Sequence, residues 1–453
     1  MRVFPPTLNV TSGLKAHLHS CAATVLLLLL LCSSAHQLQA DPDALDDEAA
    51  PHTNTCAGMK VYVHTLPSYS KQHRAVPFNL VRKEPKWPQF LTNHGFGPAF
   101  EDQIQYNPEL EASRTKNPAL FDTYQNNLHH ILEHRITRDC RVFSTQQANL
   151  FYVPLPVASL MMGTRYGTMK KKDNIAYYSR VKKFLASHPA WQRCNGCDHI
   201  LTIGRDGNEF TLSSWAGIQR NEFYMSDPFW MNVTKLSTCA CATEQTGFAP
   251  EKGKDPVYNL FGMPYPVLLH PRSKSDVTRW ISHVANFPRK NRLALVAGRR
   301  SKISIRRDLI ANCPEDPQCE YLDPSQASVS YLSMVKVYME SEFCFQPPGD
   351  NPVRRAFFDS LVAGCVPVIF TPHMADFAWY TPPALLPDIS LMVTSYEDTV
   401  RQVKEISPDR LHAMQQAIRE LIPKILYFQH EGGDAVETMF QAIQQTRPDV
   451  IHN

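Results

Sequence analysis

The sequence predicts an α/β protein built around two parallel β-sheets. Short apolar runs of strand length alternate with segments of helical length in both halves of the chain. Most of these runs are apolar at successive positions, which is typical of strands buried on both faces of a parallel sheet. A chain of 453 residues is also too long for one ordinary hydrophobic core, so we expect two doubly wound domains.

The composition is that of a globular protein with a balanced charge. Hydrophobic residues make up 43% of the chain, charged residues make up 20%, and the formal net charge is +3. Binding to nucleic acid depends on a strong positive field, which this balance does not supply. No nucleic-acid partner is therefore expected.

The N-terminal residues predict entry into the secretory pathway. An uncharged segment, 16–40, contains the leucine run 26–31; Arg2 and Lys15 precede it and acidic residues follow it. This asymmetry places the later chain in the lumen. The strongly apolar part, 21–32, is short for a membrane span, so a signal anchor and a cleaved signal peptide both stay open. The expected segments are a cytosolic tail (1–20), the anchor or signal peptide (21–35) and a stem (36–56).

Cysteine usage agrees with an oxidising compartment. Ten of the twelve cysteines follow the leader, where disulfides persist. Cys313 and Cys319 are placed to close a small ring. The pairs Cys194/Cys197 and Cys239/Cys241 have spacings that also suit zinc, although the compartment favours disulfides or free thiols. Asn232 begins a glycosylation sequon in the luminal part.

The first half of the chain alternates strands and helices. Apolar runs at 60–67, 148–155 and 198–204 predict three buried strands. The segment 120–136 carries apolar residues on one stripe at helical spacing and predicts an amphipathic helix. These elements belong to an expected α/β domain over 57–285.

The second half repeats this alternation. Strands are predicted at 292–298, 342–346 and 365–370. Helices are predicted between them, with Gly364 as the terminator of the last one, in the segments 304–312, 330–341 and 351–364. The expected domain covers 286–425, and a C-terminal helix and tail cover 426–453.

Arginines gather where such a sheet binds ligands. Ligands of parallel sheets lie at the carboxyl ends of the strands, beside helix N-termini. Arginines, a glycine and an acid follow two of the predicted strands: Arg299, Arg300, Arg306, Gly349, Arg354, Arg355 and Asp359. Guanidinium groups and helix amides suit a diphosphate, and an acid suits a ribose hydroxyl. The alternative is a surface ion pair between Arg355 and Asp359, four residues apart, worth about 0.2–0.5 kcal/mol.

Other phosphate-binding motifs are absent from the sequence. Neither GxxxxGK[ST] nor GxGxxG occurs. The one DxD, Asp41 to Asp43, lies in the predicted stem. A metal-dependent diphosphate site is therefore not expected, and the arginines would replace the metal.

Two further segments carry candidate catalytic groups. His130 to His134 matches the HxxEH pattern of zinc peptidases, but chance matches to so short a pattern are common, and a solvated helix face is the favoured interpretation. Asp198, His199 and Glu209 flank a buried strand and the Gly-containing loop after it, where an acid can serve as a general base. The alternative for the loop is that its Asp and Gly residues only form turns.

From Lys60 onward the chain resembles the exostosin-like glycosyltransferases of family 47, and within them most the plant xyloglucan galactosyltransferase group. The resemblance rests on motifs in order: "VYVHTLP", "LFYVPL", "DHILTIGR", "PYPVLLHPRSKSDVTRW", "AGRRSKISIR" and "FCFQPPGDNPVRRAFFDSLVAGCVPVIF". The last runs close to the group's pattern FCxQPxGDxxxRRxxFDSxxAGCxPVxF. "NEF" (208–210) stands where the group has WDF, so the donor half is close and the acceptor half divergent.

The resemblance implies a GT-B fold, with two Rossmann-like domains facing a cleft, and an inverting transfer from a UDP-sugar to a glycan without a metal or other cofactor. It implies a type II protein of the Golgi membrane with a luminal catalytic part, secreted if the leader is cleaved; a complex with another glycosyltransferase is a further expectation. By carry-over the seven residues named above lie on the donor side. Glu209 is the first candidate base, and His199 and Asp198 come second. The alternatives are a zinc peptidase and a glycan-binding protein without catalysis.

Overall fold

The computed structural model describes residues 56–70, 91–100, 119–165, 169–205, 227–238, 259–298, 303–349, 353–370 and 385–446. All of them lie in one compact unit, 53–453. Within these residues, no helix combines the length and hydropathy that crossing a bilayer requires. The predicted leader and stem lie almost wholly outside the described residues, so their assignment stays a prediction.

The first half of the chain forms a parallel sheet of six strands in the order β2-β1-β3-β4-β5-β6. Its strands are β1 (Val61–Val63), β2 (Arg141–Val142), β3 (Leu150–Val153), β4 (His199–Thr202), β5 (Thr234–Ser237) and β6 (Leu260–Gly262). Alternate side chains of β3 point to opposite faces, because Leu150 and Tyr152 belong to one hydrophobic cluster and Val153 to another. The sheet is therefore buried on both faces.

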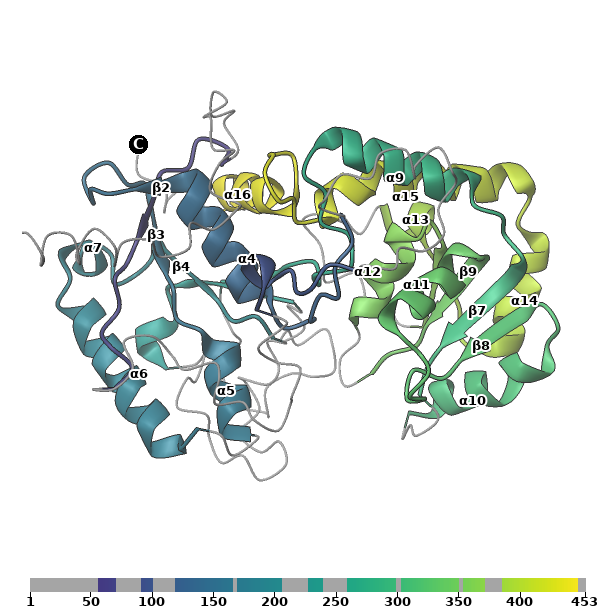
Figure 1. Ribbon diagram of the computed structural model, residues 1–453, viewed down its shortest axis with the longest axis horizontal. Coiled ribbons are helices and arrows are strands. Elements are labelled where there is room, and N and C mark those ends of the chain that lie inside the picture. The colour runs from purple at the N-terminus through teal and green to yellow at the C-terminus, as the bar shows by residue number, and fades with distance from the viewer. Residues whose placement is uncertain are drawn as a thin grey trace, which may run out of the picture. The chain divides into compact units, whose positions relative to one another are not determined.

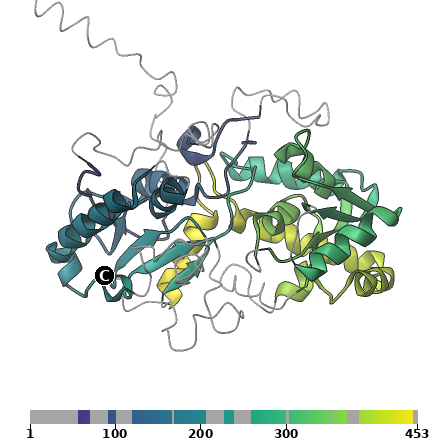
Figure 2. The ribbon, with the colours of Figure 1, turned by 90° about the horizontal axis from the view of Figure 1, so that it is seen from below.

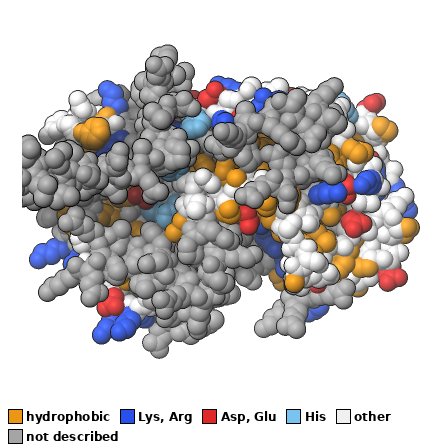
Figure 3. Space-filling view, viewed as in Figure 1, with side chains coloured by type: hydrophobic (Ala, Val, Ile, Leu, Met, Phe, Trp, Pro, Cys, Tyr) orange, Lys and Arg blue, Asp and Glu red, His pale blue; other side chains and the backbone are white. Residues whose placement is uncertain are grey.

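Helices cover both faces of this first sheet. On one face lie α4 (Leu128–Arg135), continued by a π-helical turn (Ile136–Cys140), and the C-terminal α16 (Ala435–Thr446). The other cluster holds residues of α5 (Val157–Arg165), α6 (Lys171–Ala186) and α7 (Pro189–Gln192). Helix α6 is amphipathic: it buries two tyrosines and exposes several lysines, and blue side chains are visible over it in Figure 3. The first sheet is thus doubly wound.

The second half forms a parallel sheet of five strands in the order β11-β10-β9-β7-β8. Its strands are β7 (Asn291–Val296), β8 (Cys319–Leu322), β9 (Ser341–Gln346), β10 (Val366–Ile369) and β11 (Leu391–Met392). Its helices are α9 (Lys274–Asn286), α10 (Ser304–Asn312), α11 (Tyr331–Met339), α12 (Arg355–Val362), α13 (Leu386–Ile389), α14 (Tyr396–Glu405) and α15 (Pro408–Ile425). Helices α11 and α12 pack together, as do α10 and α14 (Figure 1).

The two sheets share one strand order. Numbered along the chain within each sheet, both contain the order 2-1-3-4-5, which is that of a doubly wound α/β fold. The chain reverses its direction of winding between the first and third strands, so ligands bind beside the carboxyl ends of those two strands. In the second sheet these strands are β7 and β9, paired from Asn291↔Ser341 to Leu295↔Phe345. The predicted fold class, two doubly wound α/β domains, is confirmed.

Arg289 fixes the amino end of the second sheet. Its guanidinium group donates to carbonyl oxygens at the ends of α11 and α12, among them Met339 O (2.6 Å) and Ala363 O (3.3 Å). A half-buried cation at two helix C-termini offsets the partial negative charge of their last carbonyls. Burial nevertheless lowers the pKa of Arg289 to about 10. Gly364 follows α12 with φ +67°, the left-handed conformation predicted for a helix terminator.

The C-terminal segment returns to the first sheet, and α16 lies beside α4 in Figure 1 and against the elements of the first sheet in Figure 2. Arg135 of α4 anchors this return: its Nη1 donates to Asp434 Oδ2 (2.5 Å) and to Phe428 O. Both side chains of this ion pair are fully buried. Asp434 also accepts from the backbone N–H of Phe428 (2.9 Å) and of Val436 (3.1 Å) at the start of α16.

Most predicted elements of the second half agree with the structure to within a few residues, but one helix of the first half was wrong. The segment 120–136 was predicted as one helix, and α4 begins only at Leu128. Leu120 and Phe121 instead pair with 268–269: the Phe121 N–H donates to Leu268 O (2.8 Å). Tertiary pairing therefore overrides the helical periodicity there. Strands β2, β5, β6, β8 and β11 were not predicted.

Four disulfides link the described cysteines. The predicted ring Cys313–Cys319 is confirmed, and Cys194–Cys197 is a disulfide rather than a zinc site. The other two are Cys56–Cys140, at the start of the first sheet, and Cys344–Cys365, which joins β9 to the residue before β10. Cys239 and Cys241 lie outside the described residues.

The buried ion pair leads to a prediction about stability. We expect Arg135→Met to lower the free energy of unfolding by about 3–5 kcal/mol, because Asp434 then stays buried without its partner. Chemical denaturation measures the change. The control is Arg279→Met, which removes an exposed cation paired with Asp276 and should cost at most about 1 kcal/mol. Equal losses in the two variants would contradict the anchoring role of Arg135.

Candidate functional site

Three of the predicted donor-side residues meet beyond β9. A Cβ atom built on Gly349 would lie 2.9 Å from Cδ of Arg354 and 3.3 Å from Nη2 of Arg306. Arg306 extends from α10, and its Nη2 donates to Pro348 O (2.9 Å). Glycine leaves room here that a side chain would take from the two arginines. The structure thus brings Arg306, Gly349 and Arg354 together at the carboxyl end of β9.

Arg354 presents an available cation at this place. It is the N-cap residue of α12 and makes no side-chain hydrogen bond to that helix. In the described part of the chain, its guanidinium group forms no hydrogen bond or ion pair, and the residue is half-buried. A half-buried guanidinium at a helix N-terminus suits an anionic group such as a phosphate.

Arg355 is held quite differently from its neighbour. Its guanidinium carbon lies 3.9 Å from the centre of the Tyr331 ring, and its Nε lies 3.4 Å from Asp359 Oδ2. Its Nη1 donates to the backbone carbonyl of Thr123 (3.1 Å). The predicted pair between Arg355 and Asp359 therefore exists, but it joins a half-buried arginine to a buried carboxylate and is not a surface pair. The guanidinium group of Arg355 is therefore engaged mainly in contacts within the protein.

Asp359 is buried beneath the arginines. It accepts from the Tyr331 hydroxyl (2.6 Å) and is paired with Arg355. Burial raises the pKa of its carboxyl to about 6, against the opposing effects of Arg355 and the Tyr331 hydroxyl. These contacts occupy both carboxylate oxygens, so the structure favours a packing role over the predicted bond to a ribose hydroxyl.

Asp323, a further acid at this edge, was not predicted. It follows β8 and is buried, and its Oδ1 accepts from the Ser325 N–H (2.9 Å) and hydroxyl (2.7 Å). A Cβ atom on Gly298 would lie 3.9 Å from the same oxygen. The strand β8 has only four residues, Cys319–Leu322, and the charged Glu320 interrupts it, so no apolar run of strand length marks it in the sequence. Arg299 and Arg300 follow Gly298 and lie outside the described residues.

Two of the three candidate bases lie at the amino end of β4. His199 is the first residue of that strand, and its Nδ1 lies 2.7 Å from Asp198 Oδ1. Asp198 also accepts from Arg193 (Nε, 3.1 Å), and both candidates are fully buried. Since ligands of parallel sheets bind at the carboxyl ends, this position favours a packing role for Asp198 and His199.

Glu209, the first-choice base, follows the carboxyl end of β4 by seven residues in the sequence. It lies outside the described residues, so its assignment stays a prediction.

A cluster of histidines surrounds His199. The Nε2 atoms of His64 and His199 lie 3.0 Å apart, and the rings of His64 and His188 meet edge to face with centres 4.7 Å apart. Burial, together with the neighbouring His199 and His188, lowers the pKa of His64 to about 3. Burial also lowers the pKa values of His199 and His188. The cluster is therefore held in its neutral form.

The HxxEH segment does not form a metal site within the described residues. His129, outside the motif, pairs with Glu133 (Nε2 to Oε2, 3.0 Å). His134 stacks on His94 with ring centres 3.6 Å apart, and His130 Nε2 is buried rather than on a solvated face. Each member of the motif thus has a different environment, which does not fit a peptidase zinc.

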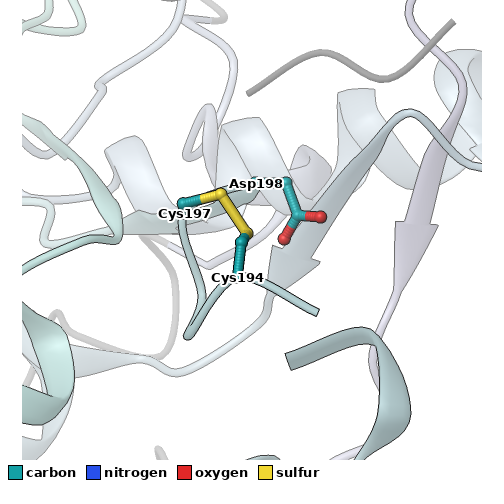
Figure 4. A group of neighbouring side chains, drawn as sticks. All are labelled: Cys194, Cys197 and Asp198. Carbon is teal, nitrogen blue, oxygen red and sulfur yellow. A yellow bond between two sulfur atoms is a disulfide. The ribbon is translucent and has the colours of Figure 1, made fainter. Parts of the chain in front are cut away.

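The one group of metal-ligating residues found among the described residues is Cys194, Cys197 and Asp198, drawn in Figure 4. The two sulfur atoms are joined as a disulfide. Asp198 is already paired with a guanidinium group and an imidazole. A disulfide is a poor metal ligand, because cysteine binds metals as the thiolate.

Asn232, the predicted glycosylation site, is exposed just before β5. Its Nδ2 lies 3.4 Å from Asn195 O, in the loop closed by the Cys194–Cys197 disulfide. Thr234 of the same sequon is buried in β5. Glycosylation of Asn232 stays a prediction, and it would have to precede folding of that strand.

The comparison with known proteins places this arrangement among the glycosyltransferases. The exostosin GT47 domain matches residues 55–408, which is most of the chain. The chain belongs to the exostosin GT47 family.

Three curated proteins from Arabidopsis thaliana are similar to the chain over much of its length. "Probable xyloglucan galactosyltransferase GT17" is 28% identical and covers 94% of this chain and 92% of its own length. "Probable xyloglucan galactosyltransferase GT13" is 27% identical and covers 86% of this chain and 83% of its own length. "Probable xyloglucan galactosyltransferase GT20" is 30% identical and covers 74% of this chain and 56% of its own length. The chain thus spans little more than half of one relative and most of the other two.

Among solved structures, a sucrose-phosphate synthase from Thermosynechococcus elongatus is 11% identical, with a TM-score of 0.34 over 88% of this chain and 98% of that one. The GtfA/B complex is also 11% identical, with a TM-score of 0.30 over 61% of each chain. Such low TM-scores give no information about the candidate site.

The histidine cluster predicts how stability depends on pH. Because the pKa of His64 is near 3 in the folded protein and about 6.5 when unfolded, the unfolded chain binds more protons between these values. We expect the free energy of unfolding to fall as the pH is lowered from 7 to 4. His64→Phe should reduce this slope by up to about 1.4 kcal/mol per pH unit. Denaturant titrations at several pH values measure it, and His412→Phe, on the exposed side of α15, is the control. An unchanged slope in His64→Phe would contradict the assignment.

Proposed function

We propose that the chain transfers a sugar, with galactose as the first candidate, from a UDP-sugar to a cell-wall polysaccharide or another glycan. The observation that carries this proposal is the available Arg354 beside Gly349 and Arg306, at the switch point of the second sheet. Family membership and the names of the relatives support the reaction class and the choice of sugar.

The geometry suggests how the donor is held. The diphosphate of UDP would lie beyond β9, where Arg354 and Arg306 approach Gly349 and where α12 begins. Arg299 and Arg300 follow β7, the strand paired with β9, and would reach the same edge of the sheet. Guanidinium groups and a helix N-terminus stabilise the charge that develops on the departing diphosphate.

The transfer itself requires a base and an acceptor hydroxyl. In the proposed mechanism the Glu209 carboxylate takes the hydroxyl proton, and the oxygen attacks the anomeric carbon from the side opposite UDP. The bond between that carbon and the β-phosphate oxygen breaks, and UDP leaves with the electron pair. This sequence inverts the configuration at the anomeric carbon. Asp198 and His199 remain less favoured bases because they lie at the amino end of β4.

We further propose that the reaction uses no metal ion and that the protein acts in the Golgi lumen, anchored through residues 21–35. The arginines at the carboxyl edge of the second sheet support the first part, since their charge can replace that of a metal. The N-terminal charge asymmetry and four disulfides support the second. A complex with another glycosyltransferase stays a hypothesis.

The donor site predicts the effect of removing Arg354. We expect Arg354→Met to weaken UDP binding by at least about tenfold, because a charge-assisted hydrogen bond contributes about 1.5–3 kcal/mol. Isothermal titration calorimetry with UDP measures the change. Arg401→Met, which removes an exposed arginine of α14, is the matched control and should bind UDP as the unmodified protein does. Unchanged binding in Arg354→Met would overturn the proposed site.

The metal-free proposal has its own test. We expect EDTA to leave UDP binding and the UDP-induced rise in melting temperature unchanged, because guanidinium groups supply the positive charge. Differential scanning calorimetry with UDP, with and without EDTA, measures the rise. Loss of the rise in EDTA and its recovery on adding Mn²⁺ would show that a metal ion takes part in donor binding.

A further inference from the structure

Arg354 and Arg355 are neighbours in the sequence but have different surroundings. Arg354 has no hydrogen bond or ion pair to any other described residue, whereas Arg355 contacts three protein groups. Arg354 is the N-cap residue and has extended backbone dihedrals (φ −140°, ψ 157°), whereas Arg355 is the first residue of α12, so the two arginines do not share one helix face. The different surroundings of Arg354 and Arg355 indicate that the two arginines have separate roles.

The contact of Arg355 with Thr123 joins the two halves of the chain. Thr123 comes before α4, in the first half, and Arg355 begins α12, in the second. The segment 119–123 is itself built into the second half: Leu120 lies in the hydrophobic core of the second sheet, and the His270 N–H donates to Ala119 O (2.8 Å). A movement at the start of α12 therefore meets this segment directly.

Thr123 is in turn fixed by several partners. Its hydroxyl donates to Phe96 O (2.6 Å) and lies 2.9 Å from His270 Nε2. The Nδ1 of His270 lies 3.0 Å from Tyr427 O, for which it is the donor. His270 lies between β6 and α9, where the chain passes from the first sheet to the second, and Tyr427 lies where it returns. Arg355 thus contacts the point at which both passages of the chain are held together.

The network around Arg355 is also stiff. The Tyr331 ring covers one face of the guanidinium, and the Tyr331 hydroxyl holds Asp359 against its edge. A half-buried guanidinium group held by a ring, a carboxylate and a carbonyl has few other positions open to it. Displacing the start of α12 must therefore displace Thr123 or break the contact.

We propose that Arg355 is a positioning residue and not a donor ligand: it transmits diphosphate binding at Arg354 to the segment 119–123 and so to the acceptor half of the chain. This inference rests on the proposed function, because it takes the diphosphate to bind at Arg354. The proposal differs from the expectation based on the family motif, which assigns both Arg354 and Arg355 to the donor side.

Hydrogen exchange of the full-length protein, with UDP as the probe, tests the proposal. In the unmodified protein we expect UDP to slow the exchange of the backbone N–H groups of Phe121, Asp122 and Thr123, which are hydrogen-bonded in the structure. In Arg355→Met, UDP should still bind within about threefold of the unmodified Kd, and the slowing at 121–123 should disappear. Arg354→Met is the matched control and should lose UDP binding by at least about tenfold.

A second variant guards against misfolding. Arg355→Met leaves Asp359 buried without its cation, so Arg355→Met/Asp359→Asn removes both charges and should fold with the same loss of coupling. A tenfold loss of UDP binding in both Arg355 variants would overturn the proposal and make Arg355 a donor ligand. UDP-dependent slowing that persists in these variants, or that is absent from the unmodified protein while UDP binds, would also overturn it. Absence of UDP binding to the unmodified protein would instead contradict the proposed function.

Discussion

The pairing of β7 with β9 is the interaction on which the candidate site depends. These strands are separated in the sequence by α10, β8 and α11, and lie side by side because β8 goes to the edge of the sheet. Their carboxyl ends bring the residues after Val296 next to those after Gln346. No local feature of either segment could place them together; the strand order alone does so.

Around that pairing, charge is distributed by what each arginine can reach. Arg289, at the opposite end of the sheet, donates its hydrogen bonds to helix carbonyls. Arg355 contacts a tyrosine ring, a carboxylate and a backbone oxygen. Arg354 and Arg306 remain near a glycine that leaves space beside them. Arg354, which has no hydrogen bond or ion pair in the described part of the chain, is available for a ligand, and Arg306 beside it donates to Pro348 O.

The first sheet uses its polar residues mainly for packing. Asp198 and His199 lie at the amino end of β4, away from the edge where ligands of such sheets bind, and they form a buried network with His64, which follows β1. The C-terminal helix completes this half through the Arg135–Asp434 pair, so the first sheet depends on residues that come last in the chain. The stability of the first half therefore depends on the C-terminal segment that contains Asp434 and α16.

The sequence by itself determined the α/β class, the position of most elements of the second half, the Cys313–Cys319 disulfide and the family. Apolar runs, helical periodicity and turn residues such as Gly364 are local signals, and local energetics suffice to read them. The motif from Phe343 to Phe370 is a continuous stretch of sequence, so the family can be identified from it without knowledge of the tertiary structure.

The tertiary structure decided everything that depends on contacts between distant residues. The predicted helix 120–136 begins only at Leu128, because Leu120 and Phe121 pair with a segment about 150 residues later in the sequence. The tertiary structure separated Arg354 from Arg355, and it buried Asp359 and His199, whose types alone had suggested ligand or catalytic roles. Residue type fixes what a side chain can do chemically. Burial, strand order and the partners supplied by remote segments fix which of those options is used.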